Sequence, residues 1–394
     1  MNDIMPPSRR PAAPSVPANP EPPTPAAASA PTPSSTAHTS RQPGSWRRHW
    51  PALAVIGGLL LAGGGVYAWT LLAPQPEPRA IVVGHATPTP TPTPTPLKKA
   101  SPLTGELVDP ALANQPIISV IVENSTDARP QSGLSSAGVV YEALAEGGIT
   151  RFQTFFLDNL PPSLGPVRSL RPYFVDWAME FLAPVAHAGG SQTALDLAVQ
   201  VGLHNLNALV IGAPTFFRTT DRPAPHNLYT TGSLLTKLLA ARHLNQPATF
   251  TVSPRKPDSP PATGTTAPNP KITIDYSGAA YKASYSYNPD TNDYTRSVGG
   301  ALHIDRNTGQ AIHVKNIVVE YMPTSSSDGL HLLMITIGSG KAIVFRDGTA
   351  VTGTWVKDSR TSRTRLLDAS GADIPLDVGN TWYSIVPVGR PVTY

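Results

Sequence analysis

The feature that most constrains this chain is an apolar run from Ala52 to Ala73, which contains no charged residue. At about 1.5 Å rise per residue, a helix of this length spans the ~30 Å hydrocarbon core of a bilayer. We therefore predict one transmembrane helix within residues 50–74. The alternative is the core of a cleaved signal peptide. Such cores are only about 7–15 residues long, and no clear small-x-small cleavage site follows this run.

The segments on either side of the apolar run predict a tail and a stalk. The first fifty residues contain twelve prolines and few large aliphatic residues, so we expect residues 1–49 to form a disordered tail. Five consecutive Thr-Pro pairs from Thr87 to Pro96 predict an extended, semi-rigid stalk over residues 75–100. Arg41, Arg47 and Arg48 precede the run, which predicts a cytoplasmic N-terminus and an extracytoplasmic bulk in a single-pass protein of the cell membrane.

Charge and cysteine content narrow the classes of function. The formal net charge of +4 is misleading, because the first fifty residues carry +3 and the next fifty +2, which leaves −1 for residues 101–394. A nearly neutral outer portion offers little attraction for nucleic acid, and we expect no nucleic-acid partner. Without any cysteine, the chain has neither a disulfide framework nor a thiolate metal site. The sequence gives no reason to expect a metal or another cofactor.

The remaining chain predicts an α+β fold in two regions. Residues 101–250 interleave apolar strand-like runs with amphipathic helical ones, which predicts a mixed sheet with helices packed on it. Residues 251–270 are rich in proline and threonine and are predicted to be a linker. Residues 271–394 contain short β-rich runs separated by turn signals, which predicts a mostly β region. The expected elements of the first region include strands at Ile117–Val122, Val139–Glu146, Ile149–Leu157, Val185–His187 and Leu206–Ile211, and helices at Arg171–Leu182, Thr193–Val201 and Ser233–Leu244. We expect Ser191 to cap the helix at Thr193–Val201.

Candidate site residues begin at a predicted β-hairpin. Gly147-Gly148 separates two aliphatic strands, and a two-residue loop there would set Leu144 opposite Arg151. Period two then places Glu142 and Glu146 on one face, with Arg151 diagonal to both carboxylates. This pattern is typical either of the ion-paired floor of a polar cleft or of an exposed sheet face with surface ion pairs.

Two arginines precede a predicted helix. Arg168 and Arg171 are three residues apart, and Pro172 fits the first helical turn. Paired guanidinium groups at a helix start can bind a carboxylate or phosphate in a two-pronged manner. The alternative is that they pair with Asp176 and Glu180 of the same helix. Tyr173 of this segment is also a candidate ligand-binding residue.

Two further polar segments complete the candidate site. The run from His187 to Ser191 joins a strand to a helix, so backbone N–H groups at this turn could receive an anion. Glycine-containing turns of this kind also occur for purely structural reasons. Asp221, Arg222, His226 and Asn227 lie in a proline-stiffened loop with four hydrogen-bonding side chains. No HExxH, Walker A or G-x-S-x-G motif occurs, so zinc proteases, P-loop nucleotidases and serine esterases lack support.

At these residues the chain resembles the YerB-like family of bacterial membrane-attached proteins, a two-part domain of unassigned activity. The resemblance runs from SPLTGELVD at Ser101 through GPVRSLRPYFVDWAMEF, HAGGS and DRPAPHNLYT to GKAIVFRDG and GNTWYSIVP, and covers nearly all of Ser101–Pro387. It implies an outer-surface location and a two-part ectodomain. Relatives are often lipoproteins attached through a cysteine, whereas this chain has none and is expected to use the helix at Ala52–Ala73.

The function predicted from these patterns is binding of a cell-envelope ligand, a glycan or a peptide, in a polar cleft of the first region. Two other classes stay open. One is an enzyme acting on envelope polymers, with Glu142 or Glu146 paired with Asp176 or Asp221 as acid and base. The other is a scaffold whose second region meets an envelope protein. The candidate ligand-binding residues are Glu142, Glu146, Arg151, Arg168, Arg171, Tyr173, Asp176, His187, Ser191, Asp221, Arg222, His226 and Asn227.

Overall fold

The computed structural model describes residues 97–394, apart from 248, 263, 265, 327–328 and 330. The predicted tail and membrane span, together with nearly all of the predicted stalk, therefore lie outside the described residues. Within the described part of the chain, no helix is both long enough and apolar enough to cross a bilayer.

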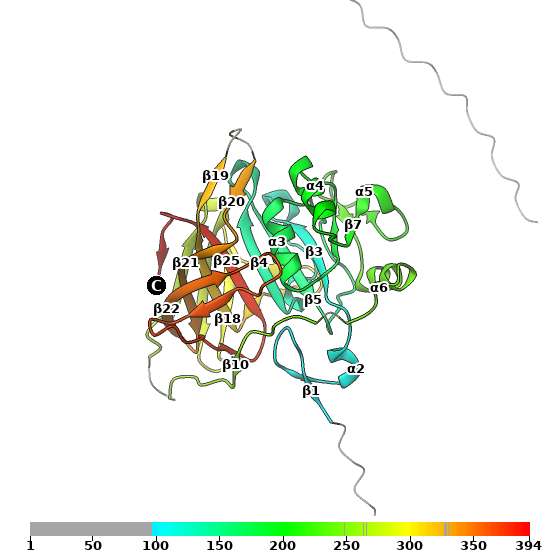
Figure 1. The fold of residues 1–394 in the computed structure, drawn as a ribbon. Coiled ribbons are helices and arrows are strands. Elements are labelled where there is room, and N and C mark those ends of the chain that lie inside the picture. The colour runs from blue at the N-terminus through cyan, green and yellow to red at the C-terminus, as the bar shows by residue number, and fades with distance from the viewer. Residues whose placement is uncertain (1–96, 248, 263, 265, 327–328, 330) are drawn as a thin grey trace, which may run out of the picture. The chain divides into compact units, whose positions relative to one another are not determined.

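A ten-stranded mixed sheet draws strands from both sequence regions (Figure 1). At its centre β25 of the second region pairs in parallel with β18 on one side and with β4 of the first region on the other. The order across the sheet is β23 (Arg365–Leu367), β22 (Thr349–Lys357), β21 (Gly338–Arg346), β18 (Asn316–Met322), β25 (Thr381–Pro387), β4 (Val139–Leu144), β5 (Thr150–Phe156), β3 (Ile118–Glu123), β6 (Val185–His187) and β7 (Asn205–Asn207). The two regions thus share one sheet.

A second sheet is built from the second region alone. It contains β14 (Ala301–Leu302), β13 (Asp293–Val298), β12 (Lys282–Asn288), β11 (Lys271–Asp275), β26 (Val392–Thr393) and β17 (His313–Val314). Five short strand pairs complete the β structure: β1 (Lys99–Ala100) with β2 (Leu107–Val108), β8 (Phe217–Arg218) with β9 (Leu228–Tyr229), β10 (Arg255–Lys256) with β24 (Leu376–Asp377), β15 (Ile304–Asp305) with β16 (Gln310–Ala311), and β19 (Thr324–Ser326) with β20 (Leu332–Met334). The α-helices of the described part of the chain are α2 (Pro110–Ala113), α3 (Pro172–Glu180), α4 (Gln192–Gln200), α5 (Ala208–Ile211) and α6 (Gly232–Ala241). Short 3₁₀ turns are η1 (Thr126–Ala128), η2 (Leu134–Ser136), η3 (Glu146–Gly148) and η4 (Ala279–Tyr281).

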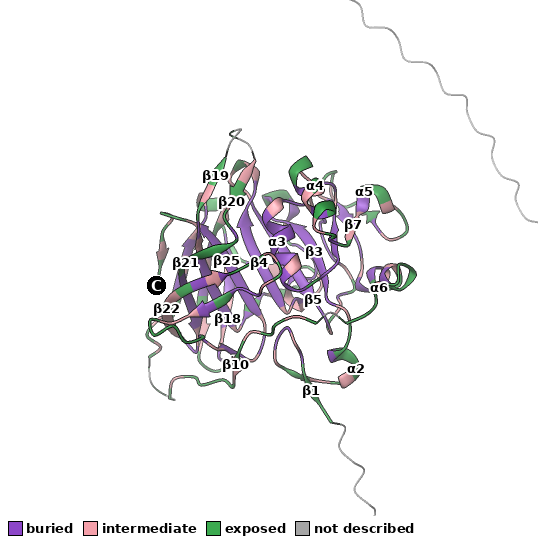
Figure 2. Cartoon of the chain, viewed as in Figure 1, coloured by how far each residue is buried: buried purple, intermediate pink, exposed green. Residues whose placement is uncertain are grey.

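Both faces of the ten-stranded sheet are covered, and Figure 2 shows its strands to be mostly buried. Successive strand residues point to opposite faces, so Val318 and its neighbour Val319 belong to different hydrophobic clusters. One cluster joins the sheet to α3 and α4, with Trp177 of α3 stacked on Tyr141 at 4.9 Å between ring centroids. The other joins it to the second sheet and α6. Burial on both faces explains why the central strands read as continuous apolar runs.

The predicted α+β class and the mostly β second region are confirmed, but one element is wrong. The run Leu206–Ile211 was expected to be a strand, whereas only Asn205–Asn207 is extended and Ala208–Ile211 forms the one-turn helix α5. The Asn207 side chain caps this helix by accepting from the backbone N–H of Leu209. Such a cap competes with continued strand pairing, and periodicity alone does not reveal it.

The predicted register of the β4–β5 hairpin is also wrong, by one residue. Leu144 pairs with Thr150, and Arg151 pairs with Ala143. The connection is longer than two residues, because Glu146–Gly148 forms a 3₁₀ turn in which both glycines have positive φ, 65° and 72°. A shift of one residue moves a side chain to the other face, so Glu142, whose partner is Phe152, and Arg151 lie on opposite faces of the sheet.

Candidate functional site

Six charged or titratable side chains gather where the parallel strands β3, β4 and β6 end. We call them the charged array: Glu123, Glu146, Arg151, Arg168, Arg171 and His226. Glu123 is the last residue of β3 and lies opposite Arg151 of β5. The two other arginines come from the segment between β5 and α3, which pairs with β3 through Val122 and Val167. The carboxyl end of parallel strands is where α/β folds commonly place ligands.

One half of the array is centred on Glu146. Arg171 binds both carboxylate oxygens in a two-pronged contact, with 2.6 Å between Nη2 and Oε2. Arg151 adds an ion pair at 3.6 Å and donates to the carbonyl of Ser169 at 2.8 Å. Burial opposes ionisation of Glu146, but the hydrogen bond and charge of Arg171 lower the pKa of its carboxyl. Burial also lowers the pKa of Arg151, to about 10.

The other half of the array is centred on Glu123, which is only 4% exposed. Its Oε1 lies 3.1 Å from Arg168 Nε and 3.0 Å from His226 Nδ1, and it accepts from the Ser125 hydroxyl at 2.9 Å. Its Oε2 is buried and has no hydrogen-bond partner among the described residues. The Arg168 side chain is 27% exposed, so a buried, unsatisfied carboxylate oxygen lies beside a cation that solvent can reach.

Glu142 does not belong to the array. It is fully buried on the opposite face, where its Oε2 accepts from Arg296 at 2.6 Å, Trp382 at 3.0 Å and Tyr276 at 3.1 Å. Its Oε1 accepts from Thr150 at 2.9 Å. Every one of these distances is that of a formed hydrogen bond. Glu142 therefore ties the strands of the first region to those of the second and does not face a ligand.

Tyr173 and Asp176 of α3 also make internal contacts. The Tyr173 hydroxyl donates to the carbonyl of Leu144 at 2.6 Å. Asp176 accepts from Thr336 at 2.5 Å and pairs with Arg360. The alternative pairing of Arg168 and Arg171 with their own helix is therefore not the one observed, because both arginines bind glutamates of other segments.

The turn from His187 to Ser191 is internally satisfied. Buried His187 contacts the carbonyl of Gly189 at 2.7 Å and Asn205 Oδ1 at 2.6 Å, and burial lowers its pKa. The N–H of Gly189 already donates to Asn207. Ser191 caps α4 by accepting from the N–H of Ala194 at 3.3 Å, as the sequence predicted.

In the proline-stiffened loop, only His226 reaches the array. Asp221 pairs with Arg306 at 2.7 Å. Arg222 donates to the carbonyls of Ala128 and Pro130 at 2.6 and 2.8 Å. Asn227 accepts from Arg218 at 2.7 Å and donates to the carbonyl of Thr219 at 2.8 Å. These three residues hold the loop in place, so that the His226 ring lies beside Glu123.

Sequence reasoning missed Glu123 and Ser125. A signal for them existed, because Glu123-Asn124-Ser125 directly follows the apolar run Ile117–Val122, and polar residues at the end of a buried strand are typical of a site. Among the described residues, no cluster of His, Asp and Glu side chains suited to a metal ion was found.

The fold defines a mixed α+β protein whose two sequence regions complete one sheet. Residues 103–245 match the N-terminal domain, and residues 272–383 the C-terminal domain, of the family described as "Protein of unknown function (DUF3048)". A Bacillus subtilis (strain 168) protein named "Putative lipoprotein YerB" is 31% identical over 300 residues, which are 74% of this chain and 87% of that protein. The crystal structure of YerB protein from Bacillus subtilis matches with a TM-score of 0.68 and 28% identity over 75% of this chain and 100% of that one. The chain belongs to this YerB-like family.

Proposed function

We propose that this protein is held at the outer face of a bacterial membrane and that its charged array binds an envelope ligand carrying both an amino group and a carboxylate, as a peptide does. The observation that carries the binding proposal is the buried, unpartnered Oε2 of Glu123 beside the partly exposed Arg168. An unsatisfied buried carboxylate oxygen is costly, and a donor from a ligand would remove that cost. The arginine offers a complementary site for a ligand carboxylate.

The same contacts favour binding over hydrolysis. In serine hydrolases the nucleophile and the acid engage opposite nitrogens of the histidine ring. Here Ser125 Oγ and Glu123 Oε1 both approach Nδ1 of His226, at 3.2 and 3.0 Å. The acid and base pairs considered from sequence gain no support either, because the carboxylates of buried Glu142, buried Asp176 and exposed Asp221 each bind other protein groups.

Replacing Arg168 by glutamine is expected to weaken retention of the full chain, in detergent, on isolated bacterial cell envelope by roughly tenfold or more, because a charged hydrogen bond contributes about 1.5–3 kcal/mol. The matched control is Arg365→Gln, which removes an exposed pair with Asp373 outside the array and should leave retention unchanged. Co-sedimentation with the envelope, over a range of protein concentrations, measures the retention of both variants and of the parent protein. Equal retention of the two variants, or no retention of the parent protein, would rule out the array as an envelope-binding site.

Membrane attachment is proposed from the apolar run Ala52–Ala73 and from the relative named as a lipoprotein. A thioether-linked lipid needs a cysteine, and this chain has none, so we assign attachment to the helix predicted there. We expect the N-terminal tail inside the cell and the region from Ser101 onward outside it.

The absence of cysteine makes this topology directly testable. Single reporters are Ser29→Cys in the predicted tail and Ala369→Cys, an exposed loop position. In intact cells a membrane-impermeant maleimide should label the second and spare the first, and permeabilised cells should show both labelled. Labelling of Ser29→Cys in intact cells, or release of the protein by a high-salt wash, would contradict the proposed topology.

A further inference from the structure

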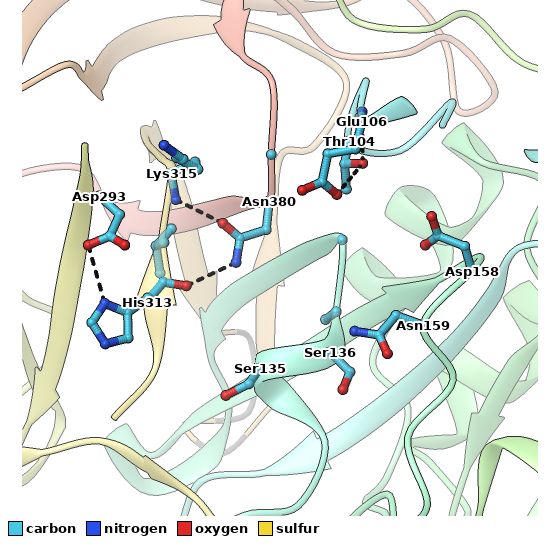
Figure 3. Close-up of a pocket in the computed structure, with 14 residues that line it drawn as sticks. Thr104, Glu106, Ser135, Ser136, Asp158, Asn159, Asp293, His313, Lys315 and Asn380 are labelled. Carbon is cyan, nitrogen blue, oxygen red and sulfur yellow. Dashed lines mark hydrogen bonds and ion pairs between the residues drawn. The ribbon is translucent and has the colours of Figure 1, made fainter. Parts of the chain in front are cut away.

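Figure 3 shows a polar cavity of about 270 Å³, whose lining residues include none of the charged array. Its walls come from the turn between β1 and β2, the η2 turn and the segment after β5 in the first region, and from β13, β17 and the turn before β25 in the second. At ~30 Å³ per water molecule, this volume equals that of about nine waters, so the cavity has room for a small polar molecule.

One wall of the cavity is held firmly. Asn380 accepts from the backbone N–H of Lys315 at 2.8 Å and donates to the carbonyl of His313 at 2.9 Å, as Figure 3 shows. Nearby, the N–H of Gly379 donates to the carbonyl of Thr104 at 2.8 Å, and that of Thr381 donates to Gly138 at 3.0 Å. The bonds of Gly379 and Thr381 join the two regions beside the cavity, and those of Asn380 fix its wall within the second region, so the space is preformed.

The cavity carries an excess of negative charge. Three carboxylates line it, those of Glu106, Asp158 and Asp293. Asp293 is paired with the His313 ring at 3.2 Å, and Glu106 accepts from the Thr104 hydroxyl at 2.9 Å. Among the described residues neither Glu106 nor Asp158 has an ion-pair partner.

The basic lining residue does not offset this charge. The ammonium group of Lys315 binds Asp258 at 2.6 Å and the carbonyls of Thr291 and Asn292 at 3.1 Å. Its charge is therefore balanced by a carboxylate that does not line the cavity. Glu106 and Asp158 line the cavity without an ion pair among the described residues, while the charge of Arg255 also acts on Glu106. A cation entering the cavity would pair with these two carboxylates.

The neutral polar side chains of the cavity indicate which other groups a cationic ligand would carry. Ser135, Ser136 and Asn159 also line the cavity, and the buried Ser135 hydroxyl oxygen has no hydrogen-bond partner among the described residues. We propose that the cavity binds a small hydroxylated amine, an amino sugar with a free ammonium group, whose charge lies near Asp158 and Glu106 and whose hydroxyls bond to the serine and asparagine side chains.

Ligand-observed NMR titration of the full chain in detergent with glucosamine tests this site, and glucose serves as the uncharged probe of the same ring. Glucosamine should bind the parent protein measurably more tightly than glucose, and Asp158→Asn should weaken glucosamine binding roughly tenfold. Asp290→Asn, at an exposed acid outside the cavity, should bind as the parent protein does. Added salt should weaken glucosamine binding and leave that of glucose unchanged.

The outcomes separate this site from the charged array. Arg168→Gln should leave glucosamine binding intact even where it abolishes envelope retention. Absence of glucosamine binding, equal affinity for glucosamine and glucose, or an unchanged affinity in Asp158→Asn would each overturn the proposal. Glu106→Gln provides a second variant at the cavity rim, so the test does not depend on the folding of one protein.

Discussion

Replacing Arg296 by methionine is expected to lower the free energy of unfolding by about 3–5 kcal/mol, because it leaves Glu142 as a buried carboxylate without a counter-charge. Both side chains of this pair are 0% exposed, and 2.6 Å separates Arg296 Nη2 from Glu142 Oε2. The guanidinium also lies 4.5 Å from the centroid of the Trp382 ring. Urea denaturation of the full chain in a fixed detergent measures the change.

The double variant E142Q/R296M is the control for this prediction. Glutamine keeps one oxygen that can accept from Tyr276 and Trp382, which now bind Oε2. It gives up the second acceptor, to which Thr150 donates, and it removes the buried charge. The double variant should therefore be more stable than Arg296→Met alone by about 1–3 kcal/mol. If the double variant is less stable than Arg296→Met, the buried charge is not the cause of the loss.

Replacing Glu320 by glutamine is expected to stabilise the protein above neutral pH by up to about 5 kcal/mol, less the about 1–3 kcal/mol that a buried amide without a partner costs. Glu320 of β18 is 0% exposed, and neither carboxylate oxygen has a hydrogen-bond partner among the described residues. Burial, with a further contribution from Glu180, raises its pKa to about 8, although Arg363 and Lys357 act in the opposite direction. The uncharged amide avoids the cost of ionising a buried carboxyl.

The sign of the pH dependence follows from that raised pKa. The unfolded chain ionises Glu320 near pH 4.3, so the stability of the parent protein falls as the pH rises from about 4.3 to about 8, where the folded state also ionises. The Glu320→Gln variant has no carboxyl at this position and should not show this fall in stability. Urea denaturation at pH 5 and pH 8 measures the difference in free energy of unfolding between Glu320→Gln and the parent protein. This difference should be larger at pH 8. The control Asp290→Asn should keep the pH dependence of the parent protein. If the difference in free energy of unfolding is the same at both pH values, or is larger at pH 5, Glu320 does not titrate in this way.

The buried pair and the charged array are physically connected. Thr150, which donates to Glu142, accepts from Asn124 at 2.6 Å. Gln131 then donates to Asn124 Oδ1 at 2.9 Å and to the backbone carbonyl of Glu123 at 3.0 Å. His303, which contacts Arg296, closes the network at Gln131 Oε1 at 2.8 Å. A satisfied buried network is rigid, so the second region helps to fix the backbone at Glu123.

Local sequence signals predicted most elements but not their assembly. The apolar runs at Val139–Glu146 and Val185–His187 correspond to β4 and β6, and Ser191 caps α4 as expected. Periodicity does not reveal that β25, near the end of the chain, lies between β18 and β4. That order depends on contacts between residues more than 200 positions apart, such as Trp382 with Glu142.

Only part of the candidate site was predicted, because local sequence signals do not show which distant residues meet. Charged residues beside glycine and proline identified Glu146, Arg151, Arg168, Arg171 and His226, which do gather in one array. Glu142 resembled them in sequence but lies on the opposite face from Arg151, because the hairpin loop is one residue longer than the glycine pair alone implies.

The amino-acid sequence by itself determined the α+β class, most strands and helices, and the family, because these follow from local periodicity, capping residues and long ordered motifs. Only the tertiary structure decided which charges face one another. Register and strand order set the face on which each side chain lies, and both depend on hydrogen bonds and packing between distant segments.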